Sequence, residues 1–89
     1  MYLAKVRGTV VATQKDRNLV GFKLLVTQRL DVVGEYIGKP DVSVDTVGAG
    51  VGETVIVVGG SSARYAAGNP DAPIDSTIIG IVDSTEIDN

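Results

Sequence analysis

The chain has 89 residues and contains neither cysteine nor histidine. Disulfide bonds are therefore excluded, and a zinc site is disfavoured because proteins bind zinc mainly through these two residue types. A domain this short buries only about 60–65% of its unfolded surface and usually needs disulfides, a metal or partner subunits. We therefore expect no cofactor and a homo-oligomer. The lack of cysteine also fits the reducing cytosol.

Further absences limit the partners. No apolar run approaches the ~20 residues of a membrane span, and the first residues lack the apolar core of a secretion signal. Eight basic against 11 acidic residues leave a net charge of −3, whereas nucleic-acid binding needs a basic surface. Tryptophan is absent, and one Phe and three Tyr offer few platforms for base stacking. We expect a cytoplasmic protein with no nucleic-acid and no membrane partner.

Alternating apolar and polar residues predict three half-buried strands, at residues 2–13, 22–30 and 41–45. Gly8, within the first strand, predicts a bulge or bend of the kind that closes barrels. Thr27 is expected to point outward. The residues expected to point inward on these strands are Tyr2, Ala4, Val6, Gly8, Val10, Ala12, Phe22, Leu24, Val26, Leu30, Val42 and Val44.

Two later strands, at residues 54–58 and 76–83, are apolar on both faces. Such a strand needs a cover on each side. A chain this short has no second layer to spare, so we expect a neighbouring subunit to supply the second cover.

One short helix is predicted at residues 61–67, where Ser61 can cap the start and Gly68 can end it. The element order predicts an all-β fold, a small five-stranded OB-like β-barrel with one short α-helix before the last strand. We expect a single barrel domain at residues 1–83 and a polar C-terminal tail at residues 84–89.

The glycine-rich segment at residues 48–52 superficially resembles a phosphate-binding loop. Such loops lead from a strand into a helix. This segment leads into the apolar strand at residues 54–58 instead. We therefore interpret it as a turn with positive φ at its glycines, whose small residues let another backbone approach closely.

The segment from Ser61 to Arg64 contains a candidate nucleophile and a candidate anion-binding residue. A serine nucleophile needs an activating base, and the chain has no histidine. We interpret Ser61 and Ser62 as helix-capping residues. Two interpretations of Arg64 remain open, a bidentate pair with a neighbour's carboxylate and a plain solvated charge.

Four acids cluster in the middle of the chain, namely Asp31, Glu35, Asp41 and Asp45. Their spacing matches no calcium loop. Asp and Glu are usually exposed, so we expect these carboxylates to be solvated. No activated catalytic group is evident, and we expect no enzymatic activity.

The stretch Val44–Glu53, followed by Gly60–Arg64, resembles the signature of the CcmL/EutN family of bacterial microcompartment and carboxysome shell vertex proteins. Residues 3–12, 23–25, 73–75 and 79–83 also resemble this family. Arg29 is a departure, because the family often has proline there, but the end of a strand tolerates either residue.

The resemblance implies a homopentamer that caps the five-fold corners of a shell otherwise tiled by hexameric shell proteins. Such a shell lies in the cytoplasm and encloses cargo enzymes. An alternative is an OB-like oligomeric adaptor module that binds a peptide or a small ligand. For the first function, the residues expected at subunit contacts or the axial channel are Gly48, Ala49, Gly50, Gly52, Ser61, Ser62 and Arg64.

Overall fold

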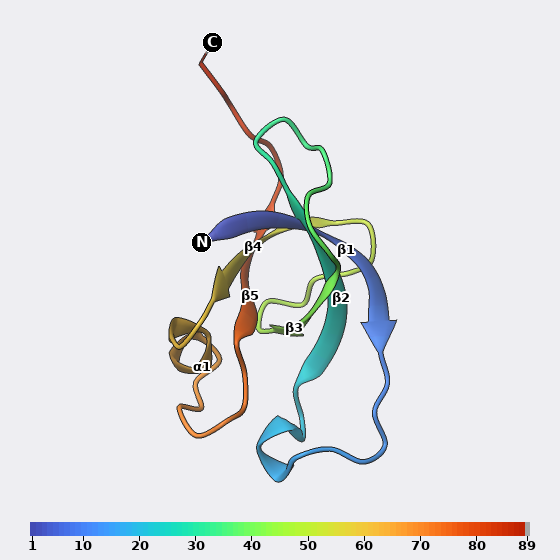
Figure 1. Cartoon of the computed structure of the whole chain (residues 1–89), viewed down its shortest axis with the longest axis vertical. Coiled ribbons are helices and arrows are strands. Elements are labelled where there is room, and N and C mark those ends of the chain that lie inside the picture. Colours follow the sequence, from blue (N-terminus) through green and yellow to red (C-terminus); the bar gives the residue numbers. More distant parts are fainter. Residues whose placement is uncertain (89) are drawn as a thin grey trace.

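The computed structural model describes residues 1–88 and has one closed barrel of five strands in the order β1-β2-β3-β5-β4 (Figure 1). Neighbouring strands are antiparallel, except for the parallel pair β3 and β5. The elements in chain order are β1 (Tyr2–Val10), η1 (Arg17–Leu19), β2 (Lys23–Leu30), β3 (Asp41–Asp45), β4 (Thr54–Gly59), α1 (Ser62–Ala66) and β5 (Ser76–Val82). The predicted OB-like barrel with one short helix before its last strand is confirmed.

The barrel closes through β1, which pairs with β2 along most of its length and with β4 through Tyr2–Lys5. The register of β1 against β2 shifts between Val6 and Gly8, so the bulge expected near Gly8 is present. A bulge bends its strand and increases the local twist. The bend lets one strand serve two neighbours and leaves the barrel without a free edge.

Two groups of buried side chains hold the molecule together. The interior cluster fills the barrel and the outer cluster lies beneath α1. Each side chain of the interior cluster is at most 1% exposed. The interior cluster comprises Ala4, Val6, Leu25, Ala49, Val55, Val57 and Ile78. The outer cluster comprises Val44, Ala63, Ala72 and Ile74, with Leu19, Phe22, Leu24, Val58 and Ala67 packed against it.

The prediction of which β2 side chains point into the barrel is wrong. Leu25 belongs to the interior cluster, whereas Phe22 and Leu24 pack against the outer one. Thr27 was expected to point outward but is only 2% exposed. Both faces of β2 are covered, so leucines lie on both of them and the alternation does not identify the barrel side.

On β3, Val42 was expected to point inward but is 50% exposed, whereas Ser43 is fully buried. Ser43 Oγ lies 2.7 Å from Thr27 Oγ1 and 2.6 Å from Ser76 Oγ. Each buried hydroxyl thus has a partner, which removes most of the cost of burying it.

The apolar strands β4 and β5 are covered partly by their own chain. Val58, on β4, packs partly buried against the outer cluster beneath α1, so its own chain supplies some of the second cover that was expected from a neighbouring subunit. On β5, the register shift against β4 leaves Ile79 unpaired, and Ile79 and Ile81 are each 37% exposed. Cover by another copy remains a prediction for these two side chains.

The ends of the elements differ slightly from expectation. β1 stops at Val10 rather than at residue 13, and β5 stops before Asp83. Residues 84–88 follow without regular structure and extend away from the barrel (Figure 1). Asn89, the last residue of the expected tail, lies outside the described residues, and the domain division after residue 83 stays a prediction. Within residues 1–88, no helix is long and apolar enough to cross a membrane.

Candidate assembly interface

The glycine loop, defined as Gly48–Gly52, connects β3 to β4 and makes a turn. Gly48 and Gly52 have φ values of 80° and 93°, a region that L side chains rarely adopt. Gly50 does not share this conformation, so the expected positive φ is present at two of the three glycines. The loop enters a strand, and the helix N-terminus that a phosphate-binding loop needs is therefore missing there.

Asp45 organises the first half of the glycine loop. Its Oδ1 accepts a hydrogen bond from the Val47 backbone N–H at 3.1 Å, and its Oδ2 accepts one from Ala49 at 2.9 Å. Only 9% of Asp45 is exposed, so the expected solvated carboxylate is wrong at this position. The physical reason is that the turn leaves two N–H groups without backbone partners, and the carboxylate satisfies both.

Three more side chains of the same chain complete the glycine loop. Gly50 donates its N–H to Glu53 Oε1 at 2.7 Å. Lys23 Nζ donates to the Ala49 carbonyl at 2.8 Å, and Lys5 Nζ donates to the Gly52 carbonyl at 3.3 Å. The loop therefore has a fixed shape in the single chain, from which Val51 stands out with 62% exposure.

α1 begins after Ser61, which occupies the N-cap position, but its side chain makes no capping hydrogen bond. The expected capping role is therefore wrong for Ser61. Its backbone is helical, with φ −65° and ψ −25°, whereas a capping side chain usually needs an extended backbone. Ser61 and Ser62 are exposed. The expected end at Gly68 is confirmed, because Gly68 has φ 80° and donates to the Tyr65 carbonyl at 3.0 Å.

Arg64 is half-buried on α1, and its Nε atom is buried without any hydrogen-bond acceptor in residues 1–88. A buried donor without a partner costs about 1–3 kcal/mol. Only Nε is buried in this way and the residue as a whole is half-buried, so a pair with a neighbour's carboxylate and a solvated guanidinium both remain predictions for Arg64.

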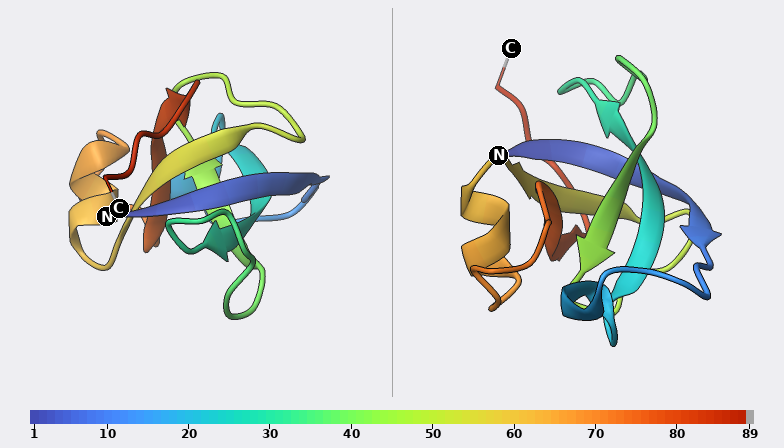
Figure 2. Two further views of the ribbon diagram at one scale, coloured as in Figure 1. Left: turned by 90° about the horizontal axis from the view of Figure 1, so that it is seen from above. Right: turned by 60° about the horizontal axis from the view of Figure 1, so that its bottom comes forward.

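The two predicted motifs lie on opposite sides of the barrel. The glycine loop extends from one side, and α1 lies on the other, in the ribbon views of Figures 1 and 2. Each motif is anchored by one fully buried alanine, Ala49 in the interior cluster and Ala63 in the outer cluster. The structure does not bring Gly48, Gly50 and Gly52 together with Ser61, Ser62 and Arg64. Residues 1–88 hold no group of three or more potential metal-ligating acids.

Residues 1–83 match the model of the family described as ethanolamine utilisation protein EutN/carboxysome. The chain belongs to the EutN/CcmL family. The bacterial microcompartment shell vertex protein GrpN of Rhodospirillum rubrum is 53% identical over 89 residues, with 100% of both chains covered. The shell vertex protein PduN of Salmonella typhimurium is 49% identical over 88 residues, covering 94% of this chain and 97% of PduN.

Among solved structures, the pentameric microcompartment shell protein GrpN from Rhodospirillum rubrum superposes on this EutN/CcmL chain with a TM-score of 0.88. The two share 52% identity, and 100% of each chain is covered. The predicted family is thus confirmed across the whole length.

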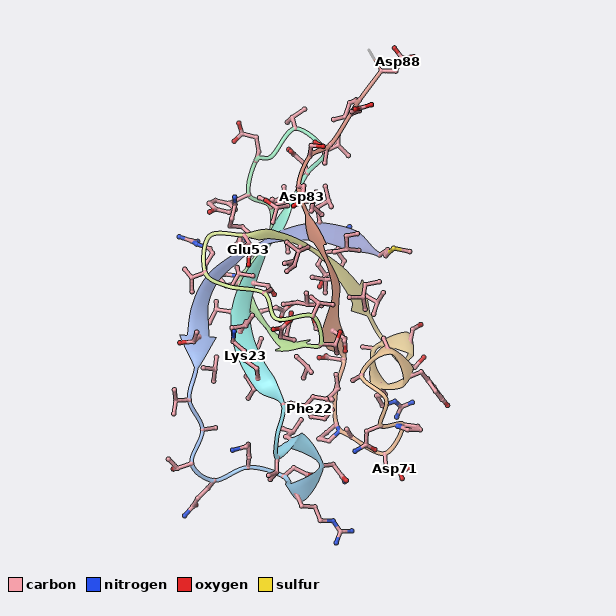
Figure 3. All side chains as sticks on the ribbon, turned by 180° about the vertical axis from the view of Figure 1, so that it is seen from behind. Phe22, Lys23, Glu53, Asp71, Asp83 and Asp88 are labelled. Atoms are coloured by element: carbon pink, nitrogen blue, oxygen red, sulfur yellow. The ribbon has the colours of Figure 1, made fainter. Side chains whose placement is uncertain are left out.

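Sequence reasoning missed the residues that shape the glycine loop of this EutN/CcmL chain. Asp45 lies four positions before Ala49, and Glu53 three positions after Gly50, so both are within reach of loop N–H groups. Aspartate just before a turn was a usable signal for Asp45. Lys23 comes from β2, far away in the sequence, and no local pattern indicates its contact (Figure 3).

Proposed function

We propose that this chain is a vertex subunit of a bacterial microcompartment shell. It forms a homopentamer at the five-fold corners of the shell and helps to enclose cargo enzymes. The observation that carries this proposal is the likeness to GrpN, a pentameric microcompartment shell protein, over the full length of both chains at 52% identity. At this identity and coverage, the surfaces that assemble are expected to correspond as well as the folds.

The surface of the chain supports an assembled state. Ile79 and Ile81 on β5 are each 37% exposed, Val51 in the glycine loop is 62% exposed, and Val42 on β3 is 50% exposed. A closed five-membered ring uses two different faces of each subunit, one for each neighbour. α1 is a candidate for one face, and the glycine loop and residues 31–40, which lie away from α1, are candidates for the other (Figures 1 and 2).

The ring works by shape and contacts rather than by chemistry. The chain lacks histidine and cysteine, and the exposed Ser61 and Ser62 have no activating base within the sequence motif. A net charge of −3 argues against nucleic acid as a partner. Hexameric shell proteins are the expected neighbours of the ring, and neither a cofactor nor a membrane is required.

Native mass spectrometry of the full chain tests this proposal. A species with five times the subunit mass is expected at micromolar concentration, and size-exclusion chromatography with light scattering should give the same mass. A stable monomer would contradict the vertex function and favour the adaptor alternative. Co-expression with hexameric shell proteins is the second test, because closed shells should form only when this chain is present.

A further inference from the structure

Arg64 has a hydrogen-bonding capacity that its own chain does not use. Its Nε is buried and has no acceptor in the part of the chain that the structure describes. A guanidinium presents its donors as a planar fork, which matches the two oxygens of a carboxylate. Native structures satisfy nearly all buried donors, so an unpaired one calls for an acceptor from outside the chain.

A shallow groove lies beside Arg64, between the start of α1 and residues 72–75. Ala72 and Ile74 form its floor but are only 1% and 6% exposed, so Pro73 and Asp75 are the exposed residues of this wall. The unused donor of Arg64 favours an incoming segment that carries an acid at this end of the groove. Because Nε is buried, the Arg64 side chain has to rotate before its fork can meet a carboxylate that enters there.

The β2–β3 connection, defined as residues 31–40, carries such an acid. Val32 and Val33 are 68% and 75% exposed, and Glu35 beside them is exposed as well. The connection is held in shape by Asp31, whose Oδ1 accepts from the N–H groups of Val33 at 3.0 Å and Glu35 at 2.9 Å. Gln28 Nε2 also donates to the carbonyls of residues 37 and 38. A segment that is already ordered loses little entropy when it binds.

We propose that the groove beside α1 receives the β2–β3 connection of a second copy of this chain, and that Arg64 pairs there with the neighbour's Glu35 carboxylate. This inference rests on the proposed ring. The site is incomplete in one subunit, because the cation comes from one copy and the anion from the next. The pair would fix the register of the contact as well as strengthen it.

Glu35 is preferred because most other acids are already engaged or wrongly placed. The carboxylates of Asp16, Asp31, Asp45 and Glu53 accept backbone N–H groups of their own chain. Asp71 and Asp75 precede β5 on the side of Arg64 itself. Among the exposed acids, Glu35 lies on a connection that carries the two exposed valines Val32 and Val33 and that its own chain holds in shape.

The placement of the two surfaces agrees with a ring. α1 and the β2–β3 connection lie apart on the barrel in every view (Figures 1 and 2). A contact between two different surfaces is heterologous, and repeated contacts of this kind close into a ring when the rotation allows it. A two-fold dimer would instead bring the same surface of both copies together.

Charge exchange in the full chain tests the pair. Native mass spectrometry over a dilution series gives the subunit concentration at which half of the rings dissociate. We expect Arg64→Glu and Glu35→Arg each to raise this concentration by about 10- to 100-fold, because each variant places two charges of the same sign against each other at the contact. The double variant should bring this concentration back to within about 3-fold of its value for the unsubstituted chain, since opposite charges then meet again with their positions exchanged.

The matched control is Arg17→Glu on η1, which makes the same charge change at an exposed arginine and should leave the rings unchanged. If Arg64→Glu does not fold, as judged by circular dichroism, Glu35→Arg and Glu35→Gln on the exposed connection carry the test. Rings that survive Arg64→Glu, or single variants that the double variant does not rescue, overturn the inference while the ring itself stands. Rescue of Arg64→Glu by Glu86→Arg, in the tail, overturns it as well. An original chain that forms no ring overturns the proposed function and this inference together.

Discussion

The glycine loop and the α1 groove differ in how their polar groups are satisfied. In the glycine loop, Asp45, Glu53 and Lys23 bond to loop backbone groups within the same chain. In the α1 groove, the Nε of Arg64 is buried without an acceptor in residues 1–88. The first surface is complete in one subunit, whereas the second is completed by another copy in our proposal.

This difference indicates two ways of building a subunit contact. A loop that its own chain holds in place offers a fixed shape, and association then costs little ordering entropy. A charged group without a partner offers specificity, because only a neighbour that places the opposite charge beside it can satisfy its unpaired donor. A heterologous ring needs two different faces, and these two surfaces have the different characters that such a ring can use.

The largest expected effect comes from weakening the support of the glycine loop. Leu25 is fully buried in the interior cluster that also holds Ala49. Leu25→Ala should lower the free energy of unfolding by about 3 kcal/mol, through lost burial and the cavity left behind. Urea unfolding at one fixed subunit concentration measures this, because association makes the apparent stability depend on concentration.

Leu24→Ala is the matched control for Leu25→Ala. Leu24 is half-buried against the outer cluster, so its truncation should cost only about 1–2 kcal/mol. Equal losses in the free energy of unfolding for the two variants would contradict the structure, in which Leu25 and not Leu24 points into the barrel.

Removing the Asp45 carboxylate tests whether the glycine loop is complete by itself. Asp45→Ala leaves the N–H groups of Val47 and Ala49 without their acceptor. We expect a loss of about 2–3 kcal/mol in the free energy of unfolding. Asp41→Ala, at the exposed start of the same strand, should change it by less than about 0.5 kcal/mol. A loss below 1 kcal/mol for Asp45→Ala would mean that the loop does not depend on this side chain.

Sequence reasoning predicted the architecture better than the orientation of side chains. Gly8, Gly68 and the apolar run at 54–58 indicate a bend, a helix end and a strand through local chemistry alone, and each is present. Leu24 and Thr27 were oriented wrongly because both faces of β2 are covered, and periodicity cannot then identify the interior.

The candidate site was less predictable than the fold. Glycines with positive φ follow from turn chemistry, and two of them are where we expected them. The contact of Lys23 with the Ala49 carbonyl joins residues 26 positions apart, so only the closed barrel brings it about. The unpaired Nε of Arg64 depends on how α1 packs, which the sequence of a five-residue helix does not determine.

Gly50→Phe separates the shape of the glycine loop from its role in assembly. A Cβ at Gly50 meets only the Glu53 Oε1 atom, at 3.4 Å, which is an ordinary van der Waals contact. The subunit should therefore keep its fold by circular dichroism. If the loop lies at a subunit contact, the added ring should weaken the pentamer by about 10-fold, which native mass spectrometry detects on dilution. Thr13→Phe, at an exposed position outside the strands, is the control, and equal pentamers for both variants would count against a contact at Gly50.

The smallest effect is expected at Ser61, at the start of α1. A serine that caps a helix contributes about 1 kcal/mol, but the Ser61 side chain makes no capping hydrogen bond. Ser61→Ala should therefore change the free energy of unfolding by less than about 0.5 kcal/mol. Gly68→Ala, at the other end of the helix, should cost about 1–2 kcal/mol, because its φ of 80° strains any residue with a Cβ. If Ser61→Ala were the more damaging of the two in urea unfolding, the hydroxyl would be bonded within the subunit. Ser61 would then be unavailable to a neighbour at the groove that it lines with Arg64.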